Sequence, residues 1–158
     1  MNLLKGRRKF PGEYRKKIIN KIENIIDMEQ HKEKIEKIKN EIYVLFKENA
    51  KNEYTNPDWI FPNHFDIMLD LVNDMCRKYN GNIIICDLAV LLHDVGLVYK
   101  RDTQSSDGHE KRSIEYAREL LKRFEIPEEI SSEVVSCIMA TDKDENILVK
   151  MQLIQSGS

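Results

Sequence analysis

The chain has 158 residues, of which 41% are hydrophobic and 33% are charged, proportions that fit a globular protein and exclude a disordered one. Its 25 basic and 27 acidic residues give a formal net charge of −2, so no overall charge favours nucleic acid or an anionic membrane as a partner. No apolar run approaches the roughly 20 residues that cross a bilayer. The three cysteines all fall in apolar helical patterns, which indicates reduced, buried thiols and a cytoplasmic location.

Residues 1–53 are predicted to form an N-terminal extension of two amphipathic helices. In the first, isoleucines recur at helical spacing between residues 12 and 28: Ile18, Ile19, Ile22, Ile25 and Ile26. In the second, after His31, a narrow apolar seam runs between lysines and glutamates: Ile35, Ile38, Ile42 and Leu45. These helices can fold as a hairpin, pack on the rest of the chain, or meet a second subunit in a homodimer. We favour packing of the second helix on the chain's own core over a dimer seam.

The stretch YTNPDWIFPN at 54–63 separates the extension from a predicted core over residues 54–158, because each proline disfavours helix at the residue before it. The following HFDIMLDLVNDMCRKY carries a strong helical stripe of apolar residues, and NGN at 80–82 indicates a turn. We interpret IIIC at 83–86 as the lead-in to a buried helix rather than as a strand. Asp87 is its expected N-cap, and Gly96 is the expected residue after its end.

Two further helices complete the predicted core. A polar loop covers residues 97–108, and DGHE at 107–110 resembles a capping box at the start of the next helix. IPEEI then opens a last helix, with Pro127 in its first turn and acidic residues where the helix dipole favours them. Since helix follows helix along the chain, the predicted fold class is all-α.

Two inward-facing histidines and one aspartate indicate a metal site. His93 lies on the buried side of its predicted helix, and His64 begins an inward-facing row on the preceding one. Neutral imidazole suits zinc, iron or nickel, and the carboxylate of Asp94 extends the choice to manganese or magnesium. Because neighbouring residues on a helix point about 100° apart, His93 and Asp94 share an ion only if it lies in the wedge between them. The alternative interpretation is an ordinary helix end with a hydrogen-bonded core histidine.

The order of these residues resembles the HD-domain superfamily of metal-dependent phosphohydrolases. His64 is followed 29 positions later (93 − 64) by the His-Asp pair in LLHDVG at 91–96, and His109 comes after a loop. The resemblance extends over about residues 57–158 and implies a helical bundle in which His64, His93 and Asp94 bind one divalent ion. It also implies hydrolysis of a phosphate ester, commonly in a nucleotide. Asp94 and His109 would be the catalytic residues, with His109 as a general acid, a second-shell group or a ligand of a second metal.

Several neighbouring residues suit this implied chemistry. A divalent ion lowers the pKa of bound water toward neutrality, polarises a phosphoryl oxygen and orients the substrate. His109, near a helix N-terminus, should tend to be neutral, and the free N–H groups of that helix start can hold a phosphate. Four basic residues that flank the loop are candidates for substrate binding, although a solvated surface position suits each equally well: Lys100, Arg101, Lys111 and Arg112.

Two parts of the chain depart from the family pattern. Thr141 stands where the family often has a histidine, which weighs against a two-metal site. The last family ligand is an aspartate, but near its expected position the chain has Gln155, Ser156, Gly157 and Ser158, and both Asp142 and Asp144 come too early. A truncated chain, a degenerate member and a water in the fourth position are all compatible with this. Three protein ligands and a water still make a catalytic site of the zinc type.

From the sequence we expect a metal-dependent phosphohydrolase or phosphodiesterase that acts on a small nucleotide-like phosphate ester. The alternative is a degenerate, non-catalytic module of the same fold that binds metal or nucleotide, or acts as a scaffold with residues 31–50 as its docking face. Neither interpretation involves a membrane. Nucleic-acid binding is not expected, because the helices mix both signs of charge and aromatic residues are only 8% of the chain.

Overall fold

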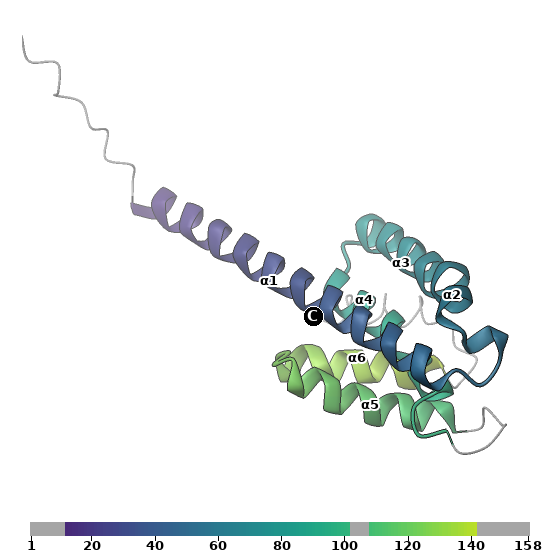
Figure 1. Ribbon diagram of the computed structural model, residues 1–158. Helices are drawn as coiled ribbons and strands as arrows, with labels where there is room; N and C mark the ends of the chain where they lie inside the picture. Colours follow the sequence, from purple (N-terminus) through teal and green to yellow (C-terminus); the bar gives the residue numbers. More distant parts are fainter. Residues whose placement is uncertain (1–11, 102–107, 142–158) are drawn as a thin grey trace, which may run out of the picture. The chain divides into compact units, whose positions relative to one another are not determined.

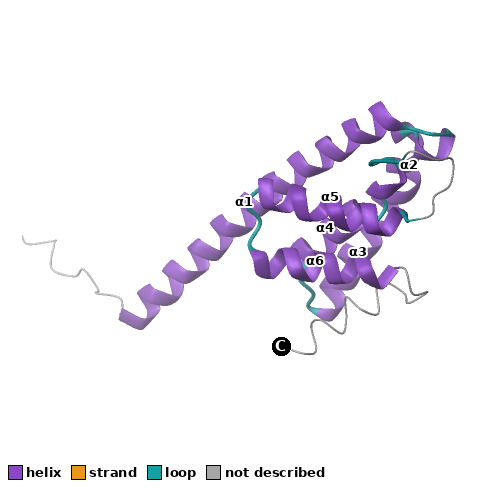
Figure 2. Ribbon diagram, turned by 90° about the horizontal axis from the view of Figure 1, so that it is seen from below, coloured by secondary structure: helices purple, strands orange, loops and turns teal. Residues whose placement is uncertain are grey.

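The computed structural model describes residues 12–101 and 108–141, and within those ranges it contains helices and no strand (Figure 2). The α-helices are, in chain order, α1 (Gly12–Asn49), α2 (Pro57–Ile60), α3 (Asp66–Tyr79), α4 (Ile83–Leu92), α5 (His109–Arg123) and α6 (Glu128–Thr141). Short helical turns of other types lie between them: η1 (Glu53–Thr55), η2 (Phe61–Phe65) and η3 (Val95–Leu97). The predicted all-α class is confirmed, and residues 83–86 form the first turn of α4.

One continuous helix, α1, occupies the region where we predicted two. From Glu13 to Asn49 the chain has no proline or glycine, and the expected break beside His31 consists of Gln, Lys and Glu, which favour helix. His31 adds a local bond, since its Nδ1 donates to the carbonyl oxygen of Asp27 at 2.7 Å. The apolar positions change their helical phase near His31, and this change of phase does not require a turn.

The chain divides into two compact units between Glu33 and Lys34, whereas we had expected a boundary near residue 53. The later part of α1 belongs to the second unit, because its apolar side chains are buried in the core of that unit: Ile35, Ile38, Ile42 and Phe46. The seam within residues 31–50 therefore packs on the chain's own core, as we favoured. It is not available as the docking face of a scaffold.

α4 is the central helix of the second unit. Five consecutive side chains in it are fully buried: Leu88, Ala89, Val90, Leu91 and Leu92. A helix that is apolar all round must be covered on every side, and α4 contacts α3, α5 and α6 (Figure 1). Neither α4 nor any other helix among the described residues combines the length and the hydropathy that crossing a membrane requires.

Two helix starts differ from their predicted caps. Asn82 caps α4, because its side-chain oxygen accepts from the backbone N–H groups of the second and third helical residues at 3.1 and 3.3 Å. Asp87 lies inside the helix instead, where burial raises its pKa to about 6. At the start of α5 the N-cap residue is Gly108, and Asp107 of the predicted capping box lies outside the described residues.

Candidate metal centre

Three side chains from separate parts of the second unit meet at one point. His64 belongs to η2, His93 is the C-cap residue of α4, and Asp94 follows it. The Nε2 atom of His64 lies 3.2 Å from His93 Nε2 and 2.9 Å from Asp94 Oδ2. His93 Nε2 lies 3.1 Å from the same carboxylate oxygen. The structure thus brings together the three groups that the sequence singled out as metal ligands.

The end of α4 allows two neighbouring residues to face the same point. The helix stops at Leu92, and Asp94 has left the helical conformation, with φ −109° and ψ 7°. On a continuing helix the side chains of His93 and Asp94 would diverge by about 100°. Because the helix ends between Leu92 and Asp94, the carboxylate and the imidazole converge.

The hydrogen bonding of His93 selects one tautomer of its ring. The side chain is buried, and its Nδ1 donates to the carbonyl oxygen of Val90 at 2.6 Å. In a neutral imidazole the proton then resides on Nδ1, so Nε2 presents its lone pair toward Asp94. Two lone pairs that face each other at 3.1 Å need a proton or a cation between them. This donor set fits a divalent ion, since imidazole nitrogen and carboxylate oxygen are both ligands of such metals.

The electrostatics of the cluster keep Asp94 ionised. Burial by itself raises the pKa of Asp94, but hydrogen bonds from His64 and His93 and their positive charge reverse this, so the pKa falls below its ordinary value. For His93, burial lowers the pKa, whereas the hydrogen bond to Asp94 and its negative charge raise it overall. A carboxylate must be deprotonated to bind a metal, and Asp94 meets that condition.

An aromatic cluster fixes the position of η2. The ring of Phe46 in α1 packs edge-on against Phe61 and Phe65, with centroids 6.3 and 5.7 Å apart. Phe65 also contacts the rings of His64 and His93, at 5.4 and 6.1 Å between centroids. Because Phe46 and Phe65 are fully buried, core packing sets the position of one histidine relative to the other. The wide π-helical form of η2 is also a feature that recurs at functional sites.

His109 approaches the cluster from α5, of which it is the first residue. Its Nε2 lies 3.6 Å from Asp94 Oδ1, the carboxylate oxygen on the other side from His64 and His93. The side chain of His109 is 36% exposed, compared with 9% for His93. His109 therefore lies at the outer edge of the cluster, where solvent can reach it.

Gly96 and Ser113 join η3 to α5, and Ser113 was not among the site residues predicted from the sequence. The Gly96 N–H donates to Ser113 Oγ at 2.8 Å, and Ser113 is fully buried. A Cβ atom at position 96 would overlap the backbone of His109 and of Ser113. This close approach requires glycine, and it sets the spacing between Asp94 and His109. A small polar residue on the apolar face of an amphipathic helix was the signal available in the sequence.

The two arginines predicted to bind substrate have structural contacts. Arg101 is buried, and its Nη1 donates to the carbonyl oxygen of Leu97 at 3.2 Å. Arg112 donates from Nε to the carbonyl oxygen of Gly96 at 2.8 Å. Both guanidinium groups thus hold the segment that follows the His-Asp pair, a role that their spacing in the sequence does not reveal.

The two lysines differ from each other. Lys100 pairs with Glu115 at the surface, and this hydrogen bond raises the pKa of the lysine. Lys111 is exposed on α5, two residues after His109. Substrate binding stays a prediction for both lysines and both arginines, and Lys111 has the surroundings that suit it best.

The cluster has three candidate protein ligands within the part of the chain that the structure describes. Thr141 ends α6 and donates from Oγ1 to the carbonyl oxygen of Ile138 at 2.7 Å. The other positions considered for a further ligand lie outside the described residues: Asp142, Asp144, Gln155, Ser156, Gly157 and Ser158. Three protein ligands suit a catalytic centre that leaves positions for water and substrate.

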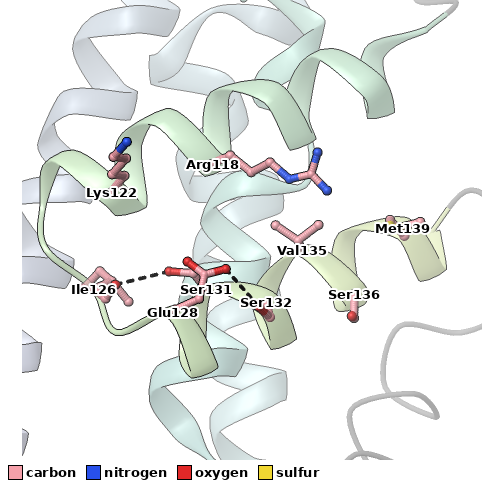
Figure 3. A pocket seen from close by; sticks show the side chains of 9 residues that line it. All are labelled: Arg118, Lys122, Ile126, Glu128, Ser131, Ser132, Val135, Ser136 and Met139. Atoms are coloured by element: carbon pink, nitrogen blue, oxygen red, sulfur yellow. Dashed lines mark hydrogen bonds between the residues drawn. The ribbon is translucent and has the colours of Figure 1, made fainter.

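A separate groove lies between α5 and α6 (Figure 3). Its volume is about 680 Å³, and none of the cluster residues lines it. Arg118 and Lys122 extend over it from α5, while on α6 Ser132 Oγ donates to Glu128 Oε1 at 3.2 Å. The groove mixes both signs of charge and is not part of the candidate metal centre.

Comparison with known proteins gives a family for this part of the chain. The family model of the HD domain matches residues 63–150, which is more than half of the chain. The matched segment begins immediately before His64 and includes His93, Asp94 and His109. No curated protein and no solved structure matches the chain significantly.

Proposed function

The chain belongs to the HD-domain family, and from this membership and the geometry of its cluster we propose that it is a metal-dependent phosphohydrolase acting on a small nucleotide-like phosphate ester. One observation carries the proposal. His64, His93 and Asp94 each offer a ligand atom within 4.8 Å of the others, although His64 and His93 are 29 positions apart in the chain. HD domains bind divalent metals, and this donor set suits that chemistry.

His64, His93 and Asp94 would hold one divalent ion, and two imidazoles with a carboxylate are compatible with zinc, manganese, iron, nickel or magnesium. When bound, such an ion supplies the Lewis acidity that activates water and polarises a phosphoryl oxygen. The surrounding residues orient the ligands. Val90 selects the tautomer of His93, and the ring of Phe65 contacts both imidazoles.

His109 is the residue best placed to transfer a proton to the substrate. Its partly exposed imidazole lies beside the cluster and, in the protonated form, can donate a proton to the leaving oxygen as a water oxygen bonds to phosphorus and the P–O bond breaks. The first backbone N–H groups of α5 can donate to phosphate oxygens, as the N-terminus of a helix does in other phosphate sites. Lys111 on the same helix can neutralise part of the phosphate charge.

A non-catalytic module that binds metal or nucleotide is the second candidate. It is favoured by the ligand set of the described residues, in which Asp94 is the only anion beside two imidazoles. A site with one anionic ligand holds a divalent cation less tightly than a site with two. Release of phosphate from a panel of nucleoside mono-, di- and triphosphates distinguishes the candidates. Protein that contains metal and releases no phosphate from any of them would support the module.

Protein purified without chelator or nickel resin is expected to contain about one divalent ion per chain, measured by inductively coupled plasma mass spectrometry. The variant His64→Ala should lose the ion, because its Nε2 is one of the three converging ligand atoms. The matched control is His31→Ala. The ring of His31 bonds to Asp27 within α1 and is not part of the cluster, so this variant should keep the ion. Equal metal loss in the two variants would contradict the assignment.

The variant His109→Gln is expected to lower kcat by about 100-fold, the lower range for a general acid or base, while the metal content stays unchanged. The reason is that His109 Nε2 faces Asp94 Oδ1 at 3.6 Å and does not join the three converging ligand atoms. Steady-state kinetics and metal analysis on the same preparation check both parts. If the ion is lost together with the rate, His109 is a ligand and not a proton donor.

A further inference from the structure

An apolar stripe along the first part of α1 is exposed. It consists of seven large side chains that are each 43–54% exposed: Tyr14, Ile18, Ile19, Ile22, Ile25, Ile26 and Met28. At 100° per residue, the five isoleucines fall within an arc of about 120° on one side of the helix. Monomeric proteins rarely leave so large a contiguous apolar surface uncovered.

The area of this stripe approaches that of a protein interface. A helix without tertiary contacts is marginal in water, because most helical stability comes from packing of the apolar face. Seven half-exposed large side chains present on the order of 600 Å² per chain, close to the roughly 800 Å² that each partner contributes to a standard interface. The stripe is therefore large enough to be buried against a partner of its own size.

The charges around the stripe have opposite signs in its two halves. Residues 12–22 carry a net charge of +3 (4 − 1), from Arg15, Lys16, Lys17, Lys21 and Glu13. Residues 23–33 carry a net charge of −3 (1 − 4) with His31 counted as neutral, from Lys32, Glu23, Asp27, Glu29 and Glu33. A segment with this pattern attracts a reversed copy of itself and repels a copy that runs in the same direction.

We propose that residues 12–33 form an antiparallel homodimer seam, in which the apolar stripe of one chain packs against the same stripe of a second copy. The self-complementary charges fit the isologous contact that a two-fold axis generates. An anionic membrane surface is a poorer partner, because residues 12–33 have a net charge of zero (+3 − 3). Binding to a protein of unrelated sequence would not explain why the charges of residues 12–33 are complementary to those of the same segment running in the opposite direction.

The sequence also fits a particular register of the two helices. When the two-fold axis passes Ile22, residue n of one chain lies level with residue 44 − n of the other. Ile22 then meets Ile22 of the second copy, Ile18 meets Ile26, and Ile19 meets Ile25. All five isoleucines of the stripe therefore meet isoleucine in this register.

At each end of the seam a basic residue of one chain lies level with an acidic residue of the other. In the same register Arg15 lies level with Glu29 of the second copy, and both positions fall within the arc of the stripe. In the single chain Glu29 contacts Lys32 at 3.1 Å, with both side chains more than 60% exposed. An exposed ion pair of this kind is weak, so Glu29 can exchange Lys32 for Arg15 of the second copy.

A charge-reversal cycle tests the direction of the pairing. Sedimentation equilibrium over about 1–100 µM is expected to give twice the chain mass of 18.6 kDa for the wild type. Arg15→Glu and Glu29→Arg should each weaken the dimer by about tenfold or more, because like charges then lie level at both ends. The double variant should restore it. A monomeric wild type, or a double variant no better than the single ones, would overturn the proposal.

Two lysine substitutions test whether the stripe itself is the interface. Ile22→Lys places two like charges at the centre of the seam and should give a monomer whose second unit still folds, shown by retained circular dichroism and metal content. The matched control is Ile67→Lys on α3, since Ile67 is 57% exposed and lies outside the stripe. The control should remain dimeric, and a dimer that survives Ile22→Lys would contradict the assignment.

Single cysteines report the register independently. Ile22→Cys should form an interchain disulfide under mild oxidation, because position 22 lies level with itself across the two-fold axis. Ile18→Cys should not, because it lies level with position 26. The native cysteines Cys76, Cys86 and Cys137 are buried and should give no background. Efficient crosslinking at both positions would indicate a parallel pairing and would overturn the antiparallel one.

Discussion

Asp94→Asn is expected to deplete the cluster of its ion and to lower kcat/KM for phosphate release by about 100-fold or more. Asparagine keeps the shape of the side chain but removes the anionic ligand, whose Oδ2 lies 2.9 Å from His64 and 3.1 Å from His93. Substitution of outer-shell groups alone costs about 10–100-fold in metal affinity or activity, and a direct ligand should cost at least the upper value. A 100-fold loss corresponds to about 2.7 kcal/mol of transition-state stabilisation.

Metal analysis and kinetics on one preparation check this result, with Asp70→Asn as the matched control. Asp70 is an exposed aspartate on α3, so the same chemical change there should leave both the ion and the rate unaltered. The circular dichroism of both variants should remain helical. If Asp94→Asn kept its ion and its rate, the proposal that His64, His93 and Asp94 form the metal site would be wrong.

Gly96→Ala is expected to lower the free energy of unfolding by about 3 kcal/mol, at the upper end for overpacking. The added Cβ would overlap the carbonyl group of His109 and the backbone nitrogen of Ser113, and backbone atoms in a packed core cannot turn aside as a flexible side chain can. For a chain of this size the loss corresponds to a fall in Tm of about 6–12 °C, measured by thermal denaturation. Activity should fall as well, because the contact between η3 and α5 sets the position of Asp94 beside His109.

Gly12 and Gly108 make a graded control series for Gly96. A Cβ at Gly12 would meet nothing within 4 Å, so Gly12→Ala should change stability by less than about 0.5 kcal/mol. Gly108 has a φ of +74° and would meet only the end of the Arg112 side chain at 3.4 Å. Gly108→Ala should therefore cost about 1 kcal/mol of backbone strain. Equal stability of all three variants would show that the close approach at Gly96 does not constrain the fold.

Local features of the sequence predicted the fold class and the composition of the cluster. The apolar run before His93 reads as a buried helix, and in the structure α4 is covered by its neighbours. The inward positions of His64 and His93 follow from helical spacing, and LLHDVG carried the resemblance to the family to which the chain belongs. The spacing of apolar residues predicts which face of a helix is buried. Residues on the buried faces of neighbouring helices, such as His64 and His93, can therefore be expected to lie close together from the sequence alone.

Contacts made by backbone groups could not be predicted in the same way. Arg101 and Arg112 were candidates for phosphate binding, and the sequence did not reveal that they donate to carbonyl groups of the segment after the His-Asp pair. Asp87 looked like a helix cap, although Asn82 caps α4. In each case several partners lay within reach along the chain. The choice between them depends on which backbone groups tertiary packing leaves without a partner.

The sequence by itself determined that both parts of α1 carry an apolar face, but it did not determine what covers each face. Ile38 and Ile42 have the same helical spacing as Ile18 and Ile22, yet in the structure the first pair is fully buried and the second is about half exposed. Likewise, the sequence placed His93 beside Asp94, but only the end of α4 made their side chains converge. The spacing of apolar residues identifies which face of a helix is apolar. The surface that packs against this face belongs to segments distant in the chain, so only the tertiary structure shows it.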